Sequence, residues 1–124
     1  MTAVHLHLAG RVPPGGWAAL EAFLAEAFAV YEAPGGITMR LLRDAEDPCA
    51  FVEVVEYETR QDHDRDQVRV DRDPVLRDLL ARWRALLDGP PRVTRYAVVV
   101  PGHTSESTSA STAAPDPPGQ PFLA

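Results

Sequence analysis

The sequence contains no lysine, so arginine supplies all 12 of its positive charges, against 18 aspartate and glutamate residues. The resulting net charge is −6. A protein that binds nucleic acid needs a basic patch or stripe, because contacts with phosphates supply much of its affinity. This acidic chain shows no such stripe, and we therefore expect no nucleic-acid partner.

Cysteine and long apolar runs are also scarce. Cys49 is the single cysteine, which excludes an intrachain disulfide and a metal site built from several cysteines. It precedes a strand and has no evident base nearby, which favours an inert thiol. No apolar run approaches the roughly 18 residues that span a bilayer, and the first residues lack the pattern of a signal peptide. The sequence predicts no membrane association and a cytoplasmic location.

The composition divides the chain into two parts. Residues 101–124 are dominated by Ser, Thr, Ala, Pro and Gly, and such a segment buries too little apolar surface to offset the entropy lost on ordering. We expect residues 1–100 to form one domain with one hydrophobic core. We expect residues 101–124 to form a disordered tail.

Four segments of the domain have the alternation or β-branched content of strands. They are Val4–Leu8, Ile37–Arg43, Ala50–Glu58 and Arg92–Val100. A polar turn at residues 44–48 predicts that the second and third segments form a hairpin. We expect Arg43 to lie opposite Ala50, which would place Arg40 opposite Glu53 as a cross-strand ion pair.

This register assigns the two faces of the hairpin. It collects five apolar residues on one face, which we expect to pack under helices: Ile37, Met39, Leu41, Val52 and Val54. The other face of the third strand would then carry Phe51, Glu53, Val55 and Tyr57. A slip by one residue would scatter the first set across both faces.

Three segments have the pattern of helices. The first begins at Trp17 and ends before Pro34, the second is a short polar helix from the N-cap Thr59 to Val70, and the third follows Asp73-Pro74 and ends at Gly89. The β-α-β-β-α-β order predicts a ferredoxin-like α+β fold, in which both crossovers are right-handed and the helices lie on one face of a four-stranded antiparallel sheet.

The predicted open face of the sheet contains an apolar patch with polar neighbours. Its members are His5, His7, Arg40, Leu42, Phe51, Glu53, Val55 and Tyr57. Exposed patches of this kind mark an interface or a binding site. A second copy of the chain, packed face to face, would cover the patch and give a two-fold homodimer.

Three motifs carry a resemblance to a known family: E-V-V-E-Y-E-T, R-Q-D-H-D and D-P-V-L-R-D-L-L-A-R-W-R-A-L-L. Over residues 3–100 the chain resembles the dimeric α/β-barrel superfamily, and within it the antibiotic-biosynthesis-monooxygenase-like domains. The resemblance implies a homodimer whose back-to-back sheets enclose a ligand cavity. Activities in that superfamily include cofactor-free oxygenation, haem degradation and isomerisation. The resemblance favours a small apolar or aromatic ligand, and we assign no cofactor.

The candidate catalytic residues are His5, His7, Glu53 and Tyr57, because a cluster of titratable groups in a cavity can transfer protons. Alternatively, they are solvated polar residues at the cavity mouth. His5 and His7 could also hold a metal with Glu53 as third ligand, but we assign no metal. The candidate ligand-binding residues are Arg40, Leu42, Phe51 and Val55. Arg40 either anchors an anionic substrate or forms a structural pair with Glu53.

Two further features favour structural roles. The run D-H-D-R-D at residues 62–66 resembles a calcium loop, but Gln67 stands where the tight turn needs glycine, and no glutamate closes the site. A solvated helix face is the simpler interpretation. Trp17 and Trp83 lie on apolar helical stripes, which predicts core packing.

The predicted function is therefore a small-molecule-binding protein, with cofactor-independent, monooxygenase-like oxidation in the cavity as the specific hypothesis. The alternatives are a non-catalytic dimerisation or binding module and a haem-binding relative. The sequence leaves open whether the protein is an enzyme.

Overall fold

The computed structural model describes residues 3–102. The part of the predicted tail from residue 103 onward lies outside the described residues. None of the helices within residues 3–102 is both long and apolar enough to cross a membrane.

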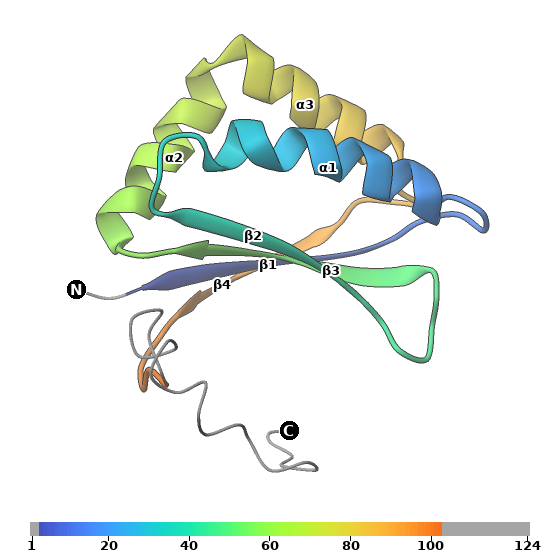
Figure 1. Ribbon diagram of the computed structural model, residues 1–124, viewed down its shortest axis with the longest axis horizontal. Helices are drawn as coiled ribbons and strands as arrows, with labels where there is room; N and C mark the ends of the chain where they lie inside the picture. The colour runs from blue at the N-terminus through green and yellow to red at the C-terminus, as the bar shows by residue number, and fades with distance from the viewer. Residues whose placement is uncertain (1–2, 103–124) are drawn as a thin grey trace.

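The described residues form four strands and three helices. In chain order these are β1 (Val4–Arg11), α1 (Trp17–Glu32), β2 (Ile37–Arg43), β3 (Ala50–Tyr57), α2 (Arg60–Arg72), α3 (Pro74–Ala85) and β4 (Arg92–Ala97). The strands pair antiparallel in the order β2-β3-β1-β4. All three helices cover the same face of the sheet (Figure 1). The predicted ferredoxin-like α+β fold is confirmed.

The starts of α2 and α3 follow from capping residues in the sequence. The side chain of Thr59 accepts a hydrogen bond of 3.0 Å from the backbone N–H of Asp62. The Asp73 carboxylate accepts one of 2.9 Å from Val75, and Pro74 occupies the first turn, where it needs no donor. Both helices therefore begin where the sequence predicted.

The strand lengths differ from those predicted. β1 continues past Leu8 to Arg11, because Gly10 and Arg11 pair with the start of β3. β4 ends at Ala97, so Val99 and Val100 do not pair and are exposed. The strand that was predicted to end at Leu8 thus includes Gly10, which pairs with Phe51.

The register of the β2–β3 hairpin corrects the prediction by one residue. Arg43 lies opposite Phe51 rather than Ala50, and Arg40 lies opposite Val54 rather than Glu53. Side chains alternate along a strand, so a shift of one residue places the opposite face of β3 beside the apolar residues of β2. The predicted Arg40–Glu53 pair is wrong. Arg40 instead forms an ion pair with Glu56.

The core consequently contains the β3 residues that were predicted to lie on the open face. Phe51, Val55 and Tyr57 are buried on the helix side, with exposed fractions of 2–5%. Phe51 belongs to a cluster with Leu20 of α1 and other helix residues. Aromatic rings bury more apolar area than valine. Burying the face with Phe51 and Tyr57 is therefore more favourable than burying the face with Val52 and Val54.

The opposite face of the sheet has no helix over it (Figure 1). By the observed pairing, its side chains are His5, His7, Ala9, Arg11, Thr38, Arg40, Leu42, Ala50, Val52, Val54, Glu56, Arg92, Thr94 and Tyr96. Val52 and Val54 therefore lie on this open face rather than under the helices, which corrects the prediction. His7 packs edge-on against the ring of Tyr96 there, with the ring centroids 4.8 Å apart.

Candidate functional site

A cavity of about 240 Å³ lies between the sheet and the helices of the same subunit. All four strands and all three helices contribute to its lining, which is mostly apolar. Arg84 of α3 and Val93 and Arg95 of β4 line the cavity and are also exposed. The cavity therefore opens to solvent between α3 and β4. The sequence had placed the cavity on the other side of the sheet.

Three buried polar atoms of the described residues have no hydrogen-bond partner: Tyr31 Oη, Glu53 Oε1 and Trp83 Nε1. All three residues line this cavity. A buried polar group without a partner costs about 1–3 kcal/mol, and such groups are uncommon in folded proteins. One largely apolar cavity is therefore lined by three residues that carry two unpartnered donors and one unpartnered acceptor.

Glu53 is the titratable group best placed for chemistry. It lies in the middle of β3 with 3% of its surface exposed. Burial raises the pKa of its carboxyl from an ordinary 4.5 to about 7, because the charged form loses its hydration. A carboxyl group with this pKa exchanges a proton near neutral pH, as general acid–base catalysis requires.

Two tyrosines that line the cavity remain phenols at neutral pH. Burial raises the pKa of Tyr31 to about 12, so its hydroxyl is a hydrogen-bond donor at neutral pH. Burial, together with a 2.5 Å hydrogen bond to Asp66, raises the pKa of Tyr57 above its usual range. Asp66 is held in turn by Arg69, at 3.2 Å. Tyr57 therefore connects β3 to Asp66 of α2 through its hydroxyl and does not act as a proton acceptor.

The structure separates the four candidate catalytic residues. Glu53 and Tyr57 line the cavity, whereas His5 and His7 lie on the open face of the sheet. The four residues do not form one cluster. Glu53 also cannot act as a third ligand to His5 and His7, because the sheet lies between them.

The four candidate ligand-binding residues are also divided. Val55 lines the cavity, and Phe51 is packed in the core beside it. Arg40 and Leu42 lie on the open face, where Leu42 is 48% exposed. Val55 therefore lines the cavity on the helix side, whereas Arg40 and Leu42 lie on the face where the sequence had placed the ligand cavity.

The sequence interpretation missed the contribution of α2. His63 is 8% exposed and Asp66 lines the cavity, so the D-H-D-R-D segment is not entirely a solvated face. Asp64 and Arg65 are exposed as predicted. The helical spacing of His63, Gln67 and Val70 was the available signal for a buried face, but the surrounding charges obscured it.

The two tryptophans pack as predicted. Trp83 is buried in the main core cluster, and Trp17 packs against that cluster from the start of α1. Trp83 also lines the cavity, and its buried indole N–H has no hydrogen-bond partner among the described residues. An apolar stripe in a sequence does not show which of its members faces a void.

Several solved structures share the architecture of this chain. A candidate antibiotic biosynthesis monooxygenase from Bordetella bronchiseptica superposes with a TM-score of 0.68 at 23% identity, covering 81% of this chain and all of that one. The chain has the antibiotic-biosynthesis-monooxygenase-like fold. This confirms, at the level of the fold, the resemblance expected from the sequence.

Two further structures with this fold come from other bacteria. A candidate antibiotic biosynthesis monooxygenase from Chloroflexus aurantiacus gives a TM-score of 0.61 at 23% identity, over 82% of this chain and 97% of that one. A variant of SnoaB, a cofactor-independent oxygenase from Streptomyces nogalater, gives a TM-score of 0.62 at 15% identity, over 83% of this chain and 98% of that one. No family model and no curated protein sequence matches the chain.

Proposed function

We propose that the cavity between the sheet and the helices binds a small aromatic molecule and that Glu53 is the general base for its cofactor-independent oxidation by O₂. The observation that carries the proposal is that Tyr31, Glu53 and Trp83 line one largely apolar cavity and that each has a buried polar atom without a hydrogen-bond partner. The shared fold with a cofactor-independent oxygenase supports the same assignment.

The size of the cavity limits the substrate. An apolar cavity of about 150 Å³ accommodates a benzene ring, so 240 Å³ suits a molecule of one or two rings. Tyr31 and Trp83 would donate hydrogen bonds to its oxygen atoms, and Glu53 would accept the proton of an acidic hydroxyl. A two-ring phenol such as 1-naphthol meets these requirements.

The proposed reaction balances with O₂ as the only co-reactant. Glu53 removes the phenol proton, and the electron-rich ring transfers an electron to O₂ and then combines with the reduced oxygen at the para carbon. Glu53 returns its proton to the resulting hydroperoxide. Loss of the para C–H proton with cleavage of the O–O bond releases water and leaves a quinone. One naphthol and one O₂ therefore give one naphthoquinone and one water.

Oxygen uptake in the presence of 1-naphthol tests the proposed reaction. Binding is measured separately, through quenching of Trp83 fluorescence in the Trp17→Phe variant. We expect saturable quenching, oxygen uptake and quinone absorbance. Glu53→Gln should retain binding and reduce uptake by about 10²–10⁴-fold, the usual contribution of a general base. Glu21→Gln, an exposed carboxylate on α1, is the matched control.

Two outcomes would contradict the proposal in different ways. Binding without oxygen uptake would favour the alternative of a non-catalytic binding module. Absence of binding would remove the assignment of the cavity as a site. A Soret band on addition of haem would favour the haem-binding alternative, although none of His5, His7 and His63, the described histidines, lines this cavity.

We also propose that a second copy of the chain covers the open face of the sheet. Leu42 and Tyr96 are large side chains on that face and are about half exposed in one subunit. Covering them in a two-fold contact would remove this apolar surface from water. Size-exclusion chromatography with light scattering should give twice the mass of 13.5 kDa. A monomer at micromolar concentration would contradict it.

A further inference from the structure

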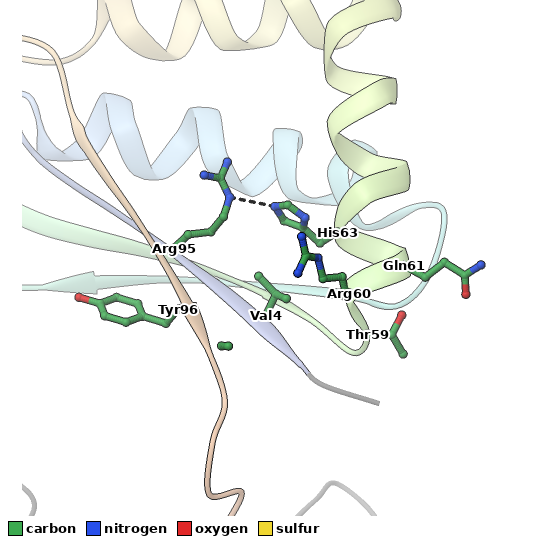
Figure 2. A pocket seen from close by; sticks show the side chains of 8 residues that line it. Val4, Thr59, Arg60, Gln61, His63, Arg95 and Tyr96 are labelled. Atoms are coloured by element: carbon green, nitrogen blue, oxygen red, sulfur yellow. Dashed lines mark hydrogen bonds between the residues drawn. The ribbon is translucent and has the colours of Figure 1, made fainter.

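A second pocket, of about 590 Å³, lies at the end of the sheet where β1, β4 and the start of α2 meet (Figure 2). Its lining is Val4, Thr59, Arg60, Gln61, His63, Arg95, Tyr96 and Ala97. Two arginines and no carboxylate belong to this set, although the chain as a whole carries a net charge of −6. The pocket is therefore a local concentration of positive charge on an acidic protein.

Arg95 is held in a fixed orientation by His63. Figure 2 shows the two side chains turned toward each other, and Arg95 Nε donates a hydrogen bond of 3.0 Å to His63 Nε2. Because a guanidinium only donates, the Nε2 atom carries no proton and the imidazole proton lies on Nδ1. That nitrogen lies 2.9 Å from Asp64 Oδ1, to which it donates. The buried imidazole thus connects Arg95 to α2.

This arrangement leaves the terminal nitrogens of Arg95 available. Within residues 3–102 the Arg95 side chain forms no ion pair, and its one hydrogen bond uses Nε. Arg60 extends from α2 beside His63 (Figure 2), and among residues 3–102 it forms one ion pair, with Asp64 at 3.9 Å, in which both side chains are exposed. Two guanidinium groups sharing a pocket repel each other unless an anion lies between them.

We propose that this pocket binds an organic oxyanion, a carboxylate or a phosphate, between Arg60 and Arg95. The planar guanidinium of Arg95, pre-oriented by His63, suits two-point binding of either group. The pocket is larger than a bare anion, and Val4 and Ala97 give it apolar surface for the organic part of the ligand. The inference does not depend on the chemistry proposed for Glu53.

Calorimetric titration of the full-length protein with inorganic phosphate and with benzoate, at constant ionic strength, tests the proposal and separates the two anion classes. Nuclear magnetic resonance of the histidine ring nitrogens locates the site, because bound anion should shift the His63 signals. We expect saturable binding of at least one anion. Arg60→Gln and Arg95→Gln should each weaken it about tenfold, as expected for loss of a charge-assisted hydrogen bond.

Arg95 also lines the Glu53 cavity, whereas Arg60 does not, so Arg60→Gln is the variant that distinguishes this pocket from that cavity. Arg77→Gln removes an exposed arginine of α3 that does not line the pocket and should leave the affinity unchanged. Glu53→Gln should also leave it unchanged. The proposal is overturned if neither anion binds saturably, if Arg60→Gln binds as the wild type does, or if Glu53→Gln abolishes binding. Failure of 1-naphthol oxidation would not affect it.

Discussion

The ring of Phe51 lies over Gly10, its direct partner on the neighbouring strand. A Cβ atom at position 10 would approach the Cζ atom of that ring to 2.8 Å. Because Phe51 is almost fully buried, the ring cannot move aside without disturbing the core. The glycine is thus required by the aromatic residue opposite it.

Gly10→Ala should therefore lower the free energy of unfolding by about 1–3 kcal/mol, the usual range for an overpacked core. Urea denaturation followed by circular dichroism measures it. Gly102→Ala, where a Cβ would meet no atom within 4 Å, is the control. In a Phe51→Leu background the effect of Gly10→Ala should shrink. An equal effect in both backgrounds would mean that the ring is not the cause.

The stability of the protein should depend on the ionisation of Glu53. Its pKa is about 7 in the folded protein and near 4.5 when unfolded, so between these values the folded state holds a proton that the unfolded state has lost. The free energy of unfolding therefore falls by a total of about 3 kcal/mol as the pH rises from about 4.5 to 7. Above pH 7 this contribution is constant.

Glu53→Gln should remove this dependence, because glutamine resembles the protonated carboxyl. Urea denaturation should show the variant and the wild type equally stable near pH 4, and the variant more stable by about 3 kcal/mol near pH 8. Equal stability at both pH values would mean that Glu53 is solvated in the folded protein.

The hydrogen bond from Tyr57 to Asp66 should also be measurable. Tyr57→Phe deletes the hydroxyl that donates to the carboxylate at 2.5 Å, and bonds to charged groups contribute about 1.5–3 kcal/mol. We expect a loss of about 2 kcal/mol in the free energy of unfolding. Tyr96→Phe, at a half-exposed position, should change little. Equal losses in the two variants would assign the effect to something other than the contact with Asp66.

The proposed homodimer predicts a position-specific effect of charge. Leu42→Asp places a carboxylate on the open face of the sheet, where burying it without a partner is unfavourable. Light scattering should show that the variant is a monomer with an unchanged circular dichroism spectrum. Val68→Asp, on an equally exposed valine of α2, should leave the mass unchanged. A dimer that persists in Leu42→Asp would exclude this face as the interface.

The elements and their order could be predicted from the sequence because their signals are local. The caps Thr59 and Asp73 determine where two helices begin, and alternation identifies the strands. The pairing of β2 with β3 could not be predicted, because both faces of β3 are apolar enough to be buried. The prediction chose the face with Val52 and Val54, whereas the larger ring of Phe51 is the better indicator of the core.

The predicted position of the cavity depended on which face of β3 was taken to be buried. Glu53 was identified as a candidate, but a carboxylate in the middle of a strand is ordinarily expected to face solvent. Its burial, and the lack of a partner for its Oε1 atom, depend on how α1 and α3 pack over the sheet. Tyr31 and Trp83 read as ordinary core residues in the sequence for the same reason. Packing between distant segments decides which core residues line a void.

The Glu53 cavity is enclosed by the helices and the sheet of one chain. Tyr31, Glu53 and Trp83 therefore all come from the same polypeptide, however many copies assemble through the open face. An inactive copy could not be rescued by a neighbour that carries the missing group. Mixed assemblies of wild-type and Glu53→Gln chains should show activity in simple proportion to the wild-type fraction, with no complementation between subunits.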